Sequence, residues 1–310
     1  MMNTIRTPQS IDYVQLFILG AVWGSAFLCI DIALTSLSPL TIAASRIIIG
    51  GTVLMACIAV MRIPIPKDAR TWGLLTVISA LNTAMPFFLI SWGQQFIDPG
   101  RTAILMSFGP FVALTLGHFL TADDRLTAQK LIGVILGFVG VVTLIGWDLV
   151  LGQTSGVMGQ FAVVGAASCY AVAGALSRRV SHVPPLSNAA LVLVLAAVYT
   201  VPVALLLDAP FAGPMPPVDV WVALAFLGVM PTALCYVMRF ELIRVVGATF
   251  LSQVSYLVPV FGVFWAWVFL AQTPAVSAIV ALGLILGGIA VSRFPRHRRP
   301  FARGADAPSA

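Results

Sequence analysis

Ten apolar runs of about 20 residues follow one another along almost the whole chain, and they constrain its fold more than any other feature. An α-helix needs about this length to cross the roughly 30 Å of hydrocarbon in a bilayer. A β-barrel would instead show alternating segments of about 10 residues. The chain is therefore predicted to be an all-α integral membrane protein. Its predicted spans cover residues 14–30, 40–60, 72–92, 102–120, 128–147, 157–177, 186–207, 220–238, 248–270 and 275–292.

The composition supports a membrane protein and argues against a soluble one. Hydrophobic residues make up 60% of the 310 residues, and charged residues only 9%. A soluble domain carries about 25% charged residues, so a soluble fold of this size could not cover its core with so few. The net charge is +6, but the basic residues lie in short loops and in the tail. Membrane lipids, and not nucleic acid, are therefore the expected partners.

Several features expected of other protein classes are missing from the sequence. The residues before the first span include Arg6 and Asp12 and no cleavage-type region, so no removable signal peptide is expected. No segment between the spans is long enough for a soluble domain. The cysteines lie far apart inside apolar runs and are expected to be buried hydrophobic residues, with no disulfide, metal or cofactor. They are Cys29, Cys57, Cys169 and Cys235.

The distribution of lysine and arginine predicts the orientation of the spans. If the N-terminus is cytoplasmic, 15 of the 17 basic residues fall in cytoplasmic loops or in the two termini. The opposite loops then hold only Arg101, and Arg46 is left within a span. Cytoplasmic loops are enriched in Lys and Arg, so both termini are predicted to be cytoplasmic, in the cell inner (plasma) membrane. The five arginines of the tail are expected to fix this orientation and to contact anionic lipid head groups.

Features of the first five spans recur in the second five, at an offset of 149 or 150 residues. Because five is an odd number, the second half must enter the membrane from the opposite side. Such an inverted repeat is typical of alternating-access transporters, which bind substrate near the midplane between the two halves. The recurring features are Trp72 with Trp221, Pro110 with Pro259, and Gly133-x-x-x-Gly137 with Gly283-x-x-x-Gly287.

The order of these motifs resembles the EamA-type branch of the drug/metabolite transporter superfamily. Trp23-Gly24-Ser25-Ala26-Phe27 is similar to the start of the family's first span, and Pro39-Leu40 followed by Arg46 resembles its second. In each half, a Pro-bearing helix is followed by a Gly-x-x-x-Gly helix. The resemblance covers residues 13–292.

This resemblance implies a ten-helix basket made of two inverted five-helix repeats around a central cavity. The first repeat would cover residues 13–147 and the second 157–292, followed by a basic cytoplasmic tail over 293–310. Family members export small metabolites, often amino acids and sometimes cationic drugs. The chain departs from the family pattern at Asp31, where many members carry a lysine.

Arg46 is the strongest candidate for a substrate-binding residue. It lies about 9 Å below the outer edge of the membrane at 1.5 Å per residue. An arginine at that depth faces a cavity or a partner, because exposure to lipid is costly. One interpretation is that its planar fork binds a substrate carboxylate. The alternative is a structural pairing with Asp31 or with backbone carbonyls.

Other polar and aromatic residues within the spans are candidates for the lining of the cavity. A midplane site needs a few oriented polar groups in an otherwise apolar pocket. The alternative for each of them is a structural hydrogen bond between helices. The amides Asn82 and Gln253 are the best candidates, because a primary amide is unfavourable in lipid. The others are Trp23, Ser25, Tyr170, Tyr236, Ser252 and Tyr256.

Four prolines lie within predicted spans, where each removes a helix hydrogen bond and bends the helix. They are either hinges for gating or fixed kinks that shape the bundle. The Gly-x-x-x-Gly motifs are expected to permit close helix packing within a monomer. The prolines are Pro86, Pro110, Pro231 and Pro259.

The sequence thus favours a secondary transporter that exports small metabolites, with amino acids, including aromatic ones, as the main expectation. A multidrug, organic-cation or nucleobase-type permease is the alternative. An enzyme is disfavoured, since none of the metalloprotease, nucleophile-elbow or intramembrane aspartate motifs is present. ATP is not expected to drive it directly, because no P-loop exists. All the acids lie at span ends, in loops or in tails, so obligatory proton coupling is not expected.

Overall fold

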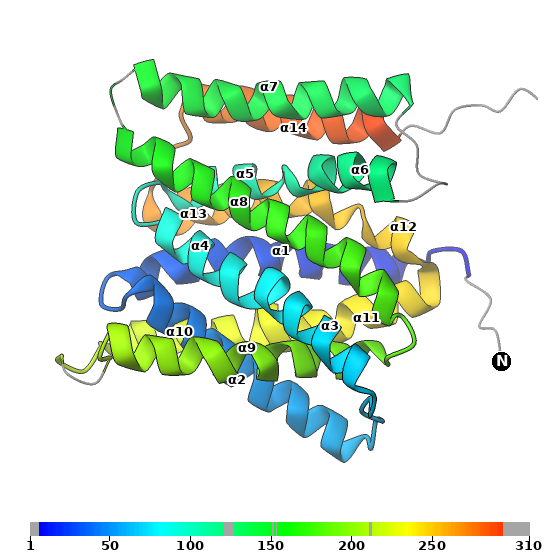
Figure 1. Cartoon of the computed structure of the whole chain (residues 1–310). Coiled ribbons are helices and arrows are strands. Elements are labelled where there is room, and N and C mark those ends of the chain that lie inside the picture. The colour runs from blue at the N-terminus through cyan, green and yellow to red at the C-terminus, as the bar shows by residue number, and fades with distance from the viewer. Residues whose placement is uncertain (1–5, 121–126, 151, 153, 211–212, 294–310) are drawn as a thin grey trace, which may run out of the picture.

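The computed structural model describes residues 6–120, 127–150, 152, 154–210 and 213–293. The secondary structure in these ranges is helical, and the helices run across the view in roughly the same direction (Figure 1). Eight helical segments are long and apolar enough to cross a membrane. Two shorter apolar helices, Val254–Leu270 and Val276–Ser292, bring the total to ten. The prediction of an all-α membrane fold with ten spans is confirmed.

The first half contains seven α-helices, which form five spans. The third span is interrupted by the π-helical segment η1, and the fourth is divided at Ser107 and Phe108. The elements are α1 (Ser10–Leu34), α2 (Pro39–Val60), α3 (Ala69–Ser79), η1 (Ala80–Ala84), α4 (Met85–Gly93), α5 (Pro99–Met106), α6 (Gly109–Leu120) and α7 (Ala128–Val150).

The second half repeats this order, including a π-helical segment in its third span. The elements are α8 (Thr154–Ser177) with the short 3-10 turn η2 (Arg178–Val180), α9 (Pro185–Leu207), α10 (Val218–Leu227), η3 (Gly228–Leu234), α11 (Cys235–Val246), α12 (Ala248–Leu251), α13 (Val254–Leu270) and α14 (Val276–Arg293).

Helices of each half pack against helices of the other half. Helix α2 packs along α9, and α7 packs along α14, so each of these helices meets its own counterpart (Figure 1). Helix α1 packs against α10, α11 and α13 of the second half, while α8 packs against α4, α5 and α6 of the first. Swapping the two halves therefore preserves these contacts. Since α1 and α8 start at opposite faces of the bundle, the two five-helix repeats are inverted, as predicted.

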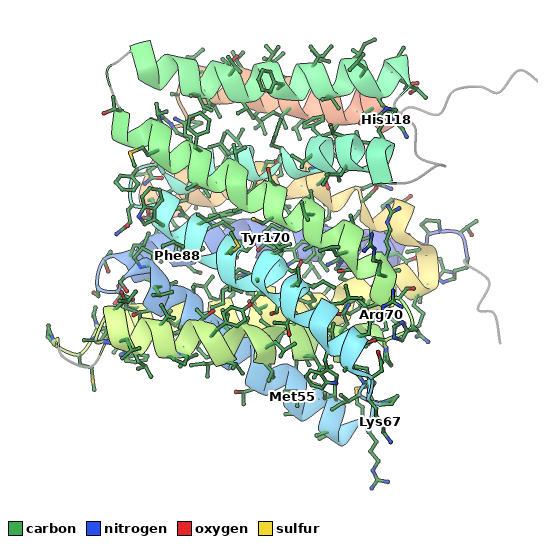
Figure 2. All side chains as sticks on the ribbon, in the orientation of Figure 1. Met55, Lys67, Arg70, Phe88, His118 and Tyr170 are labelled. Carbon is green, nitrogen blue, oxygen red and sulfur yellow. The ribbon has the colours of Figure 1, made fainter. Side chains whose placement is uncertain are left out.

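Basic side chains gather at the face where α1 begins. Lys67, Arg70 and His118 lie at that end of the bundle (Figure 2). Helix α14 ends at the same face, which agrees with an even number of spans (Figure 1). The end of the chain, including the predicted basic tail over 293–310, lies almost wholly outside the described residues.

Two predicted span boundaries are wrong in the second half. The eighth span extends to Val246, well past the predicted end at residue 238. The charged residues that suggested a loop continue the helix, and Arg244 pairs with Glu241 at 2.6 Å, three positions apart. The predicted ninth span is divided, because Ser252 and Gln253 form a turn between α12 and α13. Hydropathy could not predict this break, because a turn of two residues leaves the mean hydropathy of the run unchanged.

One of the Gly-x-x-x-Gly motifs does not make the close helix contact predicted for it. A Cβ added to Gly133 would lie 2.6 Å from the carbonyl oxygen of Gly288, so α7 and α14 approach closely there. Gly283 and Gly287, whose motif was predicted to permit close packing, have no side-chain or foreign backbone atom within 4 Å of such a Cβ. The face of α14 that carries Gly288, and not the face of the Gly-x-x-x-Gly motif, is turned toward α7.

Candidate functional site

The two π-helical segments occupy corresponding positions in the two halves. The 149-residue offset that aligns Trp72 with Trp221 also aligns Thr83 of η1 with Thr232 of η3. π-Helical turns are rare and often mark functional sites. Interrupted spans at matching places of an inverted repeat point to the substrate site of a transporter. The substrate site is therefore expected in the region between η1 and η3.

Arg46 of α2 lies at this place and is buried, with 8% of its surface exposed. Its Nε donates a hydrogen bond of 2.8 Å to Oγ1 of Thr232, in the other half of the molecule. The Thr232 hydroxyl in turn donates to the carbonyl oxygen of Leu227 at 2.8 Å. The Cζ atom of Arg46 lies 3.9 Å from the centroid of the Phe87 ring, a cation–π contact. Both halves thus hold the guanidinium in one orientation.

Other neutral side chains lie near the guanidinium. Tyr170 and Tyr236 are close enough to interact with it electrostatically, as are two cysteines. Tyr170 lies on α8, midway between the two faces of the bundle (Figure 2). The Nδ2 atom of Asn82 donates to the Tyr236 hydroxyl at 3.1 Å. The predicted residues Arg46, Asn82, Tyr170 and Tyr236 are therefore brought together from four different spans.

In the described part of the chain, Arg46 forms no ion pair with an acidic side chain. Asp31, the alternative partner considered from the sequence, is not among its contacts. The two terminal nitrogens of Arg46 have no acceptor among the described residues. A buried charge without a counter-ion is costly, so the site is suited to an anionic group.

Two of the predicted lining residues take part in structural hydrogen bonds near the site. Trp23 donates from Nε1 to the carbonyl oxygen of Pro231 at 3.0 Å, which ties α1 to the π-helical segment η3. The Ser25 hydroxyl donates to the carbonyl oxygen of Val22 in its own helix at 2.9 Å.

The other predicted lining residues lie elsewhere. Gln253 and Tyr256 border a separate hollow of about 300 Å³ between α1 and α13, together with Tyr13 and Phe17. Ser252 lies beside them, in the turn before α13. The sequence could not separate this group from the Arg46 group, because both lie well inside apolar runs.

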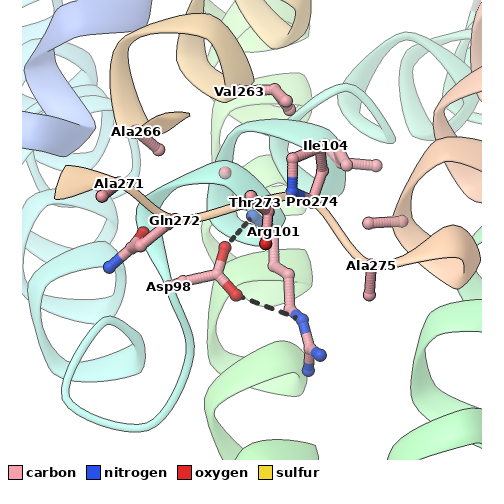
Figure 3. Close-up of a pocket in the computed structure, with 12 residues that line it drawn as sticks. Asp98, Arg101, Ile104, Val263, Ala266, Ala271, Gln272, Thr273, Pro274 and Ala275 are labelled. Carbon is pink, nitrogen blue, oxygen red and sulfur yellow. Dashed lines mark hydrogen bonds and ion pairs between the residues drawn. The ribbon is translucent and has the colours of Figure 1, made fainter. Parts of the chain in front are cut away.

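A further hollow of about 380 Å³ lies at the end of the bundle opposite the start of α1 (Figure 3). Its wall includes Asp98 and Arg101 from the first half and Gln272 and Thr273 from the second. Asp98 and Arg101 form an ion pair of 3.1 Å there. Neither of the two hollows is bordered by Arg46.

Three of the four prolines adjoin a helix interruption. Pro231 lies within η3, Pro86 is the second residue of α4 after η1, and Pro110 follows the break between α5 and α6. Pro259 instead lies inside the continuous helix α13. A further helix proline that the sequence analysis did not single out is Pro202 of α9.

Phe87 and Thr232 contact Arg46 but were not predicted from the sequence as its partners. Alignment of the two halves would have suggested them. The 149-residue offset places Phe87 opposite Tyr236 and Thr83 opposite Thr232. Both aromatic rings flank Arg46, one from each half.

Comparison with known proteins agrees with this architecture. The model of the EamA-like transporter family matches residues 12–146 and 157–294. The uncharacterized transporter YoaV of Bacillus subtilis is 23% identical over 279 residues, covering 90% of this chain and 95% of that protein. The S-adenosylmethionine/S-adenosylhomocysteine transporter of Chlamydia trachomatis serovar L2 is 24% identical over 298 residues, covering 88% and 86% of the two chains.

A solved crystal structure shares the fold, with a TM-score of 0.67 at 20% identity over 92% of this chain and 97% of that one. The family model covers both repeats and nearly all of the described residues. The chain is a multi-pass membrane protein that belongs to the EamA-like transporter family.

Proposed function

We propose that this protein is a secondary transporter that exports small metabolites across the inner membrane by alternating access, with amino acids as its main substrates. Both termini would be cytoplasmic. The substrate would bind between the two halves, with its carboxylate on Arg46. The protein would act as a monomer, since both halves of the site come from one chain.

The single observation that carries this proposal is the buried Arg46 without an acidic partner among the described residues. Its Nε is held by Thr232, and its face is covered by Phe87. This arrangement leaves the two terminal nitrogens, which match the geometry of a carboxylate. The site joins α2 of the first half to η3 of the second, so relative movement of the halves would change it.

The relatives are compatible with such a substrate. The related Chlamydia protein is named for S-adenosylmethionine and S-adenosylhomocysteine. Both compounds carry an α-amino-acid group with a free carboxylate. An organic-cation substrate is less favoured for this chain, because the fixed charge of Arg46 would repel it. No observation specifically favours a nucleobase.

Counterflow in proteoliposomes tests the proposal. Vesicles containing the purified full-length chain are loaded with a mixture of unlabelled amino acids, and uptake of each labelled amino acid is followed. Saturable uptake that requires the internal load is expected. Absence of counterflow for every amino acid would overturn the proposal.

Arg46→Lys and Arg46→Gln test the role of the arginine in the same assay. Both variants should lose most of the counterflow, because an ammonium cannot reproduce the bidentate fork. Arg179→Gln, which changes an exposed arginine in the turn η2 at the end of α8, is the matched control and should behave like the wild type. Wild-type counterflow in both Arg46 variants, at normal levels of folded protein, would contradict the assignment.

The acids of the described residues lie in loops or within the first or last two turns of a helix, so we propose that transport does not require a proton gradient. Collapse of the gradient at a constant substrate gradient should leave the flux unchanged. Abolition of transport under this condition would refute this part of the proposal.

A further inference from the structure

We infer that the Arg46 site recognises the carboxylate of its substrate and not the ammonium group. Small monocarboxylates that lack an amino group, such as 2-oxo and 2-hydroxy acids, would then be substrates alongside the matching amino acids. This inference rests on the proposed function and narrows the chemistry of the same site.

The first argument is the supply of hydrogen-bond donors. The terminal nitrogens of Arg46 have no acceptor among the described residues. The Tyr236 hydroxyl accepts from Asn82, so its own proton remains for another acceptor. The Tyr170 hydroxyl interacts electrostatically with Arg46, and no described residue accepts its proton. These donors come from α2, α8 and α11, and Tyr170 and Tyr236 pack against the same hydrophobic cluster as Phe87.

The second argument is the lack of a charged acceptor for an ammonium group beside Arg46. Within the described residues, no carboxylate forms an ion pair with Arg46. Transporters can also bind cations through backbone carbonyls at interrupted helices. Here two such carbonyls of the second half already accept hydrogen bonds. Pro231 accepts from Nε1 of Trp23 at 3.0 Å, and Leu227 accepts from the Thr232 hydroxyl at 2.8 Å.

The third argument is charge. A monocarboxylate brings one negative charge to a buried site that holds one positive charge, and the two neutralise each other. An amino acid adds an ammonium group close to the same guanidinium, where like charges repel. The amino group therefore adds no affinity at this site. A compound that has the ammonium but no carboxylate should not bind.

Matched sets of ligands distinguish recognition of the carboxylate from recognition of the ammonium group. The detergent-purified full chain is titrated with L-phenylalanine, phenylpyruvate, phenyllactate and phenethylamine, and with the matching set built on leucine. Thermal shift measures binding, and competition in the counterflow assay measures access to the transport site. The oxo and hydroxy acids are expected to bind within about tenfold of the amino acid, and the amines at least about 100-fold more weakly.

Arg46→Gln is expected to remove the response to all the carboxylates, while Arg179→Gln should keep it. If Arg46→Gln fails to fold, the ligand sets on the wild-type protein still decide the question. Binding of the amino acid and the amine without binding of the oxo acid would overturn the inference.

The same measurements distinguish a failure of this inference from a failure of the proposed function. Transport of amino acids with rejection of the oxo and hydroxy acids would overturn the inference and leave the proposed function standing. No response to any carboxylate, with saturable transport of another class of metabolite, would overturn both.

Discussion

The ring of Phe87 faces the guanidinium of Arg46, whose Cζ atom lies 3.9 Å from the ring centroid. Both residues belong to the first half, but to different spans, α2 and α4. The contact covers one face of the guanidinium, while Thr232 holds its Nε from the second half. The orientation of the charge therefore depends on both repeats.

Phe87→Leu should weaken transport without unfolding the protein. A desolvated cation–π contact contributes about 0.5–2 kcal/mol, which corresponds to a rise in KM of about 2- to 30-fold. Counterflow kinetics measure the change. Phe88→Leu, at the next position of the same helix, is the control and should keep the wild-type KM. Equal KM values in the two variants would contradict a role for the Phe87 ring.

Thr232→Val should impair transport more than Thr232→Ser. Valine keeps the shape but removes the acceptor for Arg46 Nε, and a hydrogen bond to a charged group contributes about 1.5–3 kcal/mol. Serine retains the hydroxyl and should restore most of the activity. The control is Thr83→Val, the buried counterpart in η1. A loss of transport in Thr83→Val as large as that in Thr232→Val would argue for a general packing effect.

Gly288→Ala should destabilise the fold, whereas Gly287→Ala should not. An added Cβ at Gly288 would lie 2.6 Å from the Gly133 carbonyl oxygen, so α7 and α14 would have to separate. At Gly287 the space is open, and alanine there should stabilise the helix by about 0.5–1 kcal/mol. Thermal unfolding in detergent compares the two neighbours. A lower Tm for Gly287→Ala than for Gly288→Ala would show that α14 is rotated differently.

Asp208→Asn should lower the Tm by loosening a connection between the two halves. The Asp208 carboxylate, at the end of α9, accepts hydrogen bonds from the Ser38 hydroxyl and from the backbone N–H and hydroxyl of Thr41, which lie at 2.9 and 2.8 Å. Loss of such charge-assisted bonds costs about 1.5–3 kcal/mol. Asp219→Asn, an exposed acid in the first turn of α10, is the control with the same charge change. An unchanged Tm in Asp208→Asn would mean that the network adds no stability.

Asp68 should make stability depend on pH in the acidic range. Hydrogen bonds from Thr71, including one from its backbone N–H at 2.8 Å, lower the pKa of the Asp68 carboxyl below its ordinary value. A lowered folded-state pKa stabilises the fold above the unfolded pKa, about 3.9, and this contribution is lost as the pH falls through the folded pKa. Asp68→Asn, which can still cap α3, should remove this part of the pH dependence. Identical unfolding profiles of the two proteins between pH 5 and pH 2 would contradict it.

The sequence by itself determined the membrane class, the ten spans and their division into two inverted halves. Hydropathy and charge are local properties, and a helix of about 20 apolar residues has few alternatives in a bilayer. The repeat was visible because Trp72 and Pro110 recur at a constant offset. The sequence also singled out Arg46, since an arginine is costly at that depth.

Only the tertiary structure decided which polar groups meet. Arg46 and Thr232 are 186 residues apart, and Trp23 and Pro231 are 208 apart. Such contacts depend on how each helix is rotated about its axis, and runs that are apolar on all sides carry little signal for that rotation. The same reason explains why Gly288 and not Gly287 meets α7, and why Gln253 lies away from Arg46. Hydropathy fixes that a helix crosses the membrane, and side-chain packing between helices fixes which of its faces forms the site.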